Sequence, residues 1–197
     1  GGHHGSAIAV ARREWRKLAT VGTAATILGS IRTVRQVGLP LWGVFIGLHP
    51  GAVSLAIGIA GLLDFVLFYS SGQIMDRWGR RWAIMPTLVG MALAHFALIY
   101  AHTDAWFIVV CLAMSLANGL GSGIVLTLGA DLAPHDARNE FLAAYRLQVD
   151  TGVAITPALL SVLTVAITLP GAIVAFSGLS MFGAWLGWRY LPRFGIR

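Results

Sequence analysis

Long apolar runs separated by short polar breaks are the feature that most constrains this chain. Each run holds about 20 or more mostly apolar residues, the length that an α-helix needs to cross a bilayer. The runs lack the two-residue alternation that would indicate strands. The sequence therefore predicts an all-α integral membrane protein with six transmembrane helices. The expected spans cover residues 18–47, 52–71, 82–101, 105–130, 140–167 and 171–190.

The charge content supports this class. The chain has 197 residues, of which only 11% are charged, whereas a soluble globular domain carries about 25%. So little charge could not cover the surface of a water-soluble protein, so the lipid bilayer is its expected partner. Residues 1–11 lack an apolar targeting core and are expected to be a loop or a tag remnant, which leaves residues 12–197 as the folded domain.

Lys and Arg gather in alternate connections between the runs. The N-terminal lead, the connection after the second run, the connection after the fourth run and the tail together hold eleven, and the three other connections hold none. The positive-inside rule then predicts that both termini are cytoplasmic, in the inner membrane of a bacterium. Because the positive charge is spread along one membrane face, we expect it to meet anionic lipid and expect no nucleic-acid partner.

The connection between the second and third runs reads GQIMDRWGRR, and its residues match a known pattern. The pattern resembles the signature of the major facilitator superfamily, G-x-x-x-D-R-x-G-R-[RK]. An ordinary positive-inside loop would explain the arginines but not the glycines and the aspartate at these offsets. The matching residues, which we name the signature residues, are Gly72, Asp76, Arg77, Gly79, Arg80 and Arg81.

The resemblance implies an architecture and a role for the signature. Members of the family have about twelve spans in two six-span halves, so the chain resembles one half. Its first span and the stretch NGLGSGIVLTLGADLAP resemble the C-terminal half of bacterial drug-efflux-like members. An N-terminal six-helix half is then the implied partner, facing Asp76. In the family the signature holds cytoplasmic helix ends together in the outward-open state. Gly72 is expected to let a helix pass closely, and Arg80 and Arg81 to reach carboxylates of the next basic loop.

Ionisable and amide side chains inside the spans are functional candidates, because charge is costly in lipid. We expect a polar cavity in which Arg32 or Arg35 binds an anionic or polar group of the substrate and Asp64 or Asp150 carries a coupling proton. Structural pairing of Arg35 with Asp64, and of Arg146 with Asp150, is the alternative. The full set of cavity candidates is Arg32, Arg35, Gln36, Asp64, Asn118, Arg146 and Asp150.

Small residues and a proline are candidates for packing and hinge positions. Gly119 and Gly123 are four residues apart and are predicted to form one small-residue packing face, where helices approach closely. The stretch NGLGSG is not expected to be a nucleotide-binding loop, because no strand precedes it and no lysine follows it. Gly152 and Pro157 lie where antiporters of the family carry G-x-x-x-G-P. Thr156 replaces the second glycine, a departure that weakens the antiporter assignment.

The sequence therefore favours a transporter over an enzyme. It contains no nucleophile–base pair and no cofactor fingerprint, and its one cysteine and scattered histidines give no metal-ligand spacing. We expect no cofactor and no metal. The leading interpretation is secondary active transport of a small solute by alternating access, with proton-coupled efflux. The alternatives are proton-coupled uptake of a polar or anionic metabolite, and a non-transporting six-span interaction module.

Overall fold

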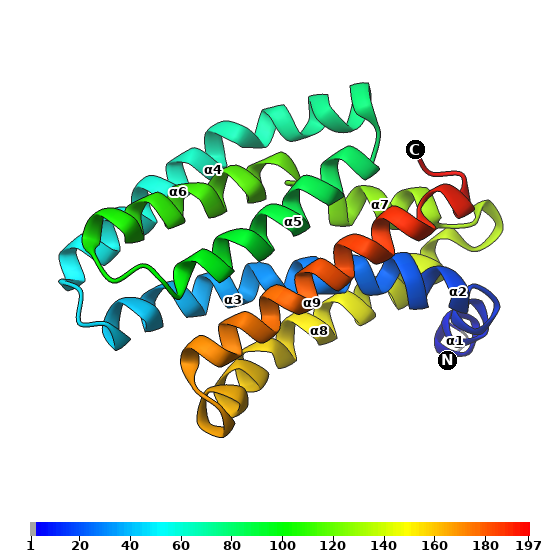
Figure 1. Cartoon of the computed structure of the whole chain (residues 1–197). Coiled ribbons are helices and arrows are strands. Elements are labelled where there is room, and N and C mark those ends of the chain that lie inside the picture. The colour runs from blue at the N-terminus through cyan, green and yellow to red at the C-terminus, as the bar shows by residue number, and fades with distance from the viewer. Residues whose placement is uncertain (1–2) are drawn as a thin grey trace.

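The computed structural model describes residues 3–197, and within that range the chain is helical with no strand. Most helices run roughly along a common direction, and short turns join them at the two ends of the bundle (Figure 1). A π-helical segment, η1 (Leu18–Gly22), connects α2 to α3. The 3-10 turns η2 (His135–Ala137) and η3 (Pro192–Phe194) precede α8 and follow α9. The α-helices are α1 (His3–Arg13), α2 (Trp15–Lys17), α3 (Thr23–Phe45), α4 (Pro50–Trp78), α5 (Arg81–Leu98), α6 (Asp104–Leu120), α7 (Ile124–Leu132), α8 (Arg138–Ala166) and α9 (Leu169–Tyr190).

Helices of membrane-spanning length make up the bundle. Five segments of the described chain are long and apolar enough to cross a bilayer: Pro50–Trp78, Arg81–Leu98, Asp104–Leu132, His135–Ala166 and Leu169–Phe194. The remaining long helix, α3, has 23 residues, which span about 34 Å at 1.5 Å per residue. It is long enough to cross but carries two arginines and a glutamine in its middle turns. The expectation of six spans is therefore met approximately.

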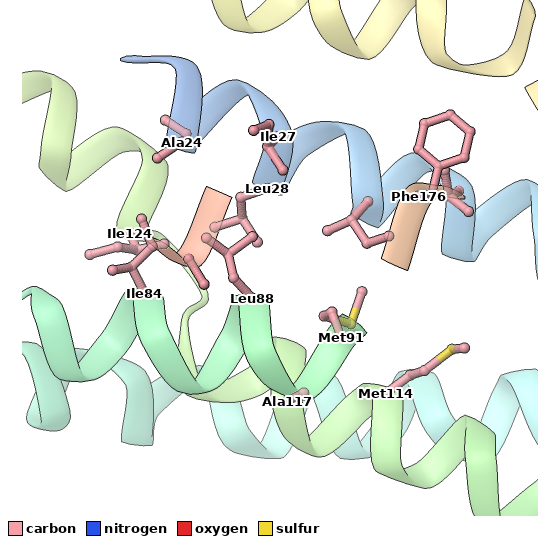
Figure 2. Packing of buried hydrophobic residues seen from close by; sticks show 14 of the residues in the cluster. Ala24, Ile27, Leu28, Ile84, Leu88, Met91, Met114, Ala117, Ile124 and Phe176 are labelled. Carbon is pink, nitrogen blue, oxygen red and sulfur yellow. The ribbon is translucent and has the colours of Figure 1, made fainter. Parts of the chain in front are cut away.

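The core of the bundle forms around α3, which contacts α4 to α9 in turn. Its apolar residues face those of α5 and α7, and Figure 2 shows Leu28 close to Leu88 with Ile124 nearby. All three side chains are fully buried. Because lipid tails are as apolar as these side chains, close packing holds the helices together rather than the exclusion of water.

The fourth expected span is not one continuous helix. α6 ends at Leu120 and α7 begins at Ile124, and between them Gly123 has φ +78°. Glycine adopts this left-handed conformation without the steric cost that a Cβ adds, so the sequence GSG can end one helix and start another. The expected span over residues 105–130 corresponds to one candidate membrane-crossing segment, Asp104–Leu132, whose helix is interrupted at this turn.

The break between α6 and α7 also separates Gly119 from Gly123, which were expected to form one packing face. A Cβ on Gly119 would lie 2.5 Å from the Cβ of Leu67, so this glycine does let α6 approach α4. A Cβ on Gly123 would meet no atom of another residue within 4 Å. The two glycines therefore do not share a packing face: one serves close approach and the other serves the backbone turn.

The N-terminal lead also differs from expectation. We expected a loop or tag remnant over residues 1–11, and the described part forms α1, in which Ala and Arg are good helix formers. Residues 1 and 2 lie outside the described residues. α1 packs against α8, and Val10 is buried.

Candidate functional site

Three helices meet at an ion pair in the middle of the bundle. Arg35 of α3 donates to Asp64 of α4 at 2.9 Å and to the hydroxyl of Ser115 of α6 at 2.6 Å. The Ser115 hydroxyl in turn donates to the carbonyl of Ala60 at 2.7 Å. The side chains of Arg35 and Asp64 are 11% and 27% exposed. The predicted pairing of these two residues is confirmed, and Ser115 extends it into a network.

Arg32 lies one turn away on the same face of α3. Its Nε donates to the side-chain oxygen of Asn118 at 2.7 Å, and a second nitrogen donates to the carbonyl of Gly121 at 2.9 Å. The Gly121 carbonyl lies in the break between α6 and α7, where it also accepts the N–H of Ile124. Asn118 then reaches Asp64 with its amide nitrogen at 3.5 Å. Arg32 is thus held by neutral oxygens.

A cavity opens beside this network. Its volume is about 220 Å³, and it brings together five of the seven predicted cavity residues. The charge is unbalanced, because two guanidinium groups face one carboxylate and, within the described residues, no carboxylate lies within 4.0 Å of Arg32. The polar lining is Arg32, Arg35, Gln36, Asp64 and Asn118, and the apolar lining is Leu39, Ile57, Ala60 and Gly61.

Arg146 and Asp150 do not join this cavity. They lie one turn apart on α8, 3.8 Å from each other, and their side chains are 77% and 68% exposed. Gln148 points the other way and donates to the carbonyl of Leu18 at 2.9 Å. The structure therefore separates the predicted set into a buried cavity group and an exposed pair.

The exposure of this pair leads to a stability prediction. In the six-helix bundle alone, replacing Arg146 with Gln should change the free energy of unfolding by less than about 0.5 kcal/mol, because an ion pair that stays in contact with water contributes little. Thermal unfolding in detergent, with Arg35→Gln as the comparison, measures the difference. A loss above about 1 kcal/mol for Arg146→Gln, the upper end for such pairs, would contradict the exposed placement.

The signature residues lie at the basic end, mostly on a helix. α4 continues to Trp78, so only Gly79 and Arg80 lie between α4 and α5. Gly79 has φ +93°, a left-handed conformation that favours glycine, and a Cβ added to it would overlap the backbone of Arg197. Both the backbone conformation and the lack of space therefore require glycine at this position. A Cβ on Gly72 would meet nothing within 4 Å, and the expected close passage of a helix is not found among the described residues.

The signature arginines reach different partners. Arg80 pairs with Asp131 at 2.9 Å, which confirms the predicted link to a carboxylate of the next basic connection. Arg81 instead donates to the carbonyl of Trp188 at 3.0 Å and lies over that ring, 3.6 Å from its centroid. The prediction of a carboxylate partner for Arg81 was wrong, because α9 packs against α5 and offers the carbonyl and ring of Trp188 to this side chain. Asp76 and Arg77 are exposed.

The hinge candidates lie where α8 crosses α3. A Cβ on Gly152 would overlap the Thr26 side chain, so this glycine allows the two helices to approach closely. α8 continues through Pro157 to Ala166. Thr156, which replaces the family's second glycine, is buried and donates to the carbonyl of Gly152 at 2.6 Å. Gly152 is therefore a packing residue, and bending at Pro157 stays a prediction.

Sequence reasoning missed two residues of the site. Ser115 precedes Asn118 by three positions and so shares its helix face, a spacing that could have identified it. The carbonyl of Gly121 could not be found in this way, because it becomes available to Arg32 only where the helix breaks.

The N-terminal lead is tied to the connection between α7 and α8. Arg13 pairs with Asp136 at 2.7 Å, and Lys17 donates to the carbonyl of Leu132 at 3.1 Å. Glu14 accepts from Lys17 at 2.9 Å. The hydrogen bond from Lys17, followed by that from Arg13, lowers the pKa of Glu14 below its ordinary value despite some desolvation. Two of the four basic residues of the lead, Arg13 and Lys17, therefore already bond to groups at the connection between α7 and α8.

Comparison with known proteins gives one match. The model of a family described as Major Facilitator Superfamily matches residues 18–195, nearly the whole chain. No curated protein and no solved structure matches. The matched range contains the cavity and all six signature residues.

Proposed function

Because the chain belongs to the Major Facilitator Superfamily, whose members are membrane transporters, we propose that it moves a small solute by alternating access in proton-coupled efflux. The cavity between α3, α4 and α6 carries this proposal. Its wall combines charged and amide groups with apolar residues such as Leu39 and Ile57. Such a wall suits a small solute with an apolar body and a polar or anionic group.

The proton proposal rests on Asp64. It is the one carboxylate that lines the cavity within the described residues, and it holds Arg35 at 2.9 Å. Efflux driven by a proton gradient requires the proton and the solute to occupy the site in turn. The deprotonated carboxylate of Asp64 would accept a polar group of the solute, and protonation would remove this acceptor and release the solute. This exchange couples one proton to one transport step through a single carboxylate.

An N-terminal six-helix half is the proposed partner. The most apolar parts of the Pro50–Trp78 and His135–Ala166 segments are only 17% buried, against 50% for α5 and for the segment that contains α9. The exposed pair of Arg146 and Asp150 lies on the second of these open helices. A second bundle placed against α4 and α8 would cover the exposed faces of these two helices and would close the cavity. The proposal includes cytoplasmic termini in a bacterial inner membrane, and the positive-inside rule applied to the basic ends supports this orientation.

One observation favours a second candidate, uptake of an anionic metabolite. The cavity has two arginines and one aspartate, and Arg32 contacts only neutral oxygens. An anionic solute would supply the missing negative charge, as would a carboxylate from the proposed partner half. The direction of transport distinguishes uptake from efflux.

Transport in liposomes tests the proposal. The full-length protein is reconstituted with an imposed pH gradient, and movement of cationic dyes and of small carboxylates is followed in both directions. We expect transport that collapses when an ionophore removes the gradient. Movement of carboxylates toward the alkaline side would favour uptake over efflux. A folded protein that moves no solute under any gradient would support the non-transporting interaction module instead.

A further inference from the structure

Two neighbouring cavities lie at the basic end, near the end of α9. The larger, of about 470 Å³, contains Trp15 and Arg16 of the lead and Tyr190 of α9. The smaller, of about 380 Å³, contains Arg81 and Arg189. Arg193 lines both. The two cavities therefore adjoin at Arg193 and are treated together as one candidate site, and no aspartate or glutamate lines either of them.

The four arginines of this site lie over aromatic rings. The guanidinium carbon of Arg81 lies 3.6 Å from the Trp188 ring centroid, and that of Arg193 lies 5.1 Å from the Tyr190 ring. Arg189 lies 5.9 Å from the same Tyr190 ring, and Arg16 lies 5.7 Å from Trp15. Within the described part of the chain, no carboxylate lies within 4.0 Å of any of the four, in contrast to Arg13, Arg35 and Arg80.

This arrangement favours an anion with several oxygens. A ring beneath a guanidinium restricts its orientation but leaves its N–H edge available. The planar fork of arginine matches the geometry of phosphate, to which it can donate two parallel hydrogen bonds. The site therefore carries four positive charges that no acidic side chain nearby neutralises.

The depth of the site identifies the source of the anion. The apolar segment Leu169–Phe194 ends within it. The exposed rings of Trp15 and Trp188 line it, and the exposed ring of Trp82 packs edge-on against Trp188. Exposed tryptophans at a helix end mark the headgroup level of a bilayer. At this level the abundant anion is the phosphate of a lipid, and basic pockets between helices on this side bind such headgroups.

We propose that these two cavities bind the phosphate headgroup of an anionic phospholipid. The site joins α2 and α5 to the end of α9 and the adjoining η3, three regions that lie far apart in the sequence, so a bound lipid would hold their basic ends together. The site uses none of the cavity residues around Asp64, and the variants that test it leave the signature residue Arg81 unchanged.

Lipid competition tests the proposal. The full chain in neutral detergent is given equal amounts of phosphatidylglycerol and phosphatidylcholine, and native mass spectrometry measures the ratio of bound lipids. We expect the unchanged chain to prefer phosphatidylglycerol. The double variant Arg189→Gln/Arg193→Gln should reduce this preference roughly 30-fold, which is about 2 kcal/mol at the ~1 kcal/mol that each arginine contributes near an anionic surface.

A matched control separates this site from general charge. Arg12→Gln/Arg138→Gln removes the same charge from exposed positions outside both cavities, and its lipid preference should stay unchanged. The single variant Arg16→Gln, in the larger cavity, should lower the preference about fivefold on the same scale, and it provides a second test if the double variant fails to fold. An equal loss in the control pair, no preference in the unchanged chain, or displacement of phosphatidylglycerol by millimolar inorganic phosphate would overturn the proposal.

Discussion

Replacing Asp64 with Asn is expected to abolish proton-driven transport and to destabilise the fold. Asn keeps the shape of the side chain but can neither carry the proton nor neutralise Arg35, which then shares the cavity with Arg32 and no anion. We expect the transport rate to fall by at least about 100-fold, the scale on which a positioned proton-transfer group contributes. We expect stability to fall by about 2 kcal/mol, less than for a fully buried pair, because the Asp64 side chain keeps 27% exposure.

Two further variants make this test specific. Asp150→Asn is the same chemical change at a spanning carboxylate outside the cavity, and its transport and melting temperature should stay close to those of the unchanged protein. Arg35→Gln/Asp64→Asn should recover much of the lost stability without recovering transport, since it removes both charges of the pair. Proton-driven transport that survives Asp64→Asn, or that is lost instead in Asp150→Asn, would remove Asp64 from the coupling role.

Replacing Gly121 with Val is expected to be the most damaging glycine substitution in the bundle. A Cβ there would overlap the Thr87 hydroxyl oxygen and lie 2.9 Å from the Thr87 Cβ and 3.1 Å from the carbonyl of Ala83. Thr87 cannot turn away freely, because its buried hydroxyl donates to that carbonyl. α6 must then move from α5, and the Gly121 carbonyl moves away from Arg32. We expect a loss of about 3 kcal/mol, the upper range for overpacking.

Thermal unfolding measures this loss, which corresponds to roughly 6–12 °C for a chain of this size. Gly178→Val is the matched control, because a Cβ on Gly178 of α9 meets nothing within 4 Å, and its melting temperature should change little. The cavity variant Arg32→Gln should lose solute binding but not show the same thermal loss. Equal melting temperatures for the two valine variants would show that α6 does not approach α5 closely at Gly121.

The class of the protein and most of its helices could be predicted from the sequence, because each depends on local composition. A bilayer requires about 20 apolar residues per crossing, so the runs and their breaks indicated where most helices lie. The exception is α4, which was expected to end at residue 71 and continues to Trp78. The pairing of Arg35 with Asp64 was also predictable. Both residues occur in apolar spans, where a charge without a partner is costly, so few other arrangements were available.

The candidate site was only partly predictable, since the direction of each helix face depends on its neighbours. Arg146 and Asp150 have the same spacing that would suit a buried pair, yet packing of α8 leaves them exposed. Arg81 was expected to meet a carboxylate and instead lies on Trp188. No local pattern decides between such partners, because both are within reach of a long, flexible side chain.

The sequence by itself determined that this chain is a helical membrane protein with a family signature at one basic end. Hydropathy and residue spacing act over one helix at a time, so they suffice for that conclusion. Only the tertiary structure decided that the helix is interrupted at Gly121–Gly123 and that Arg32 donates to the Gly121 carbonyl at this break. It alone also decided that five polar residues share one cavity. Those features arise where separate helices pack together, and the free energy of that packing depends on contacts between residues that lie far apart in the sequence.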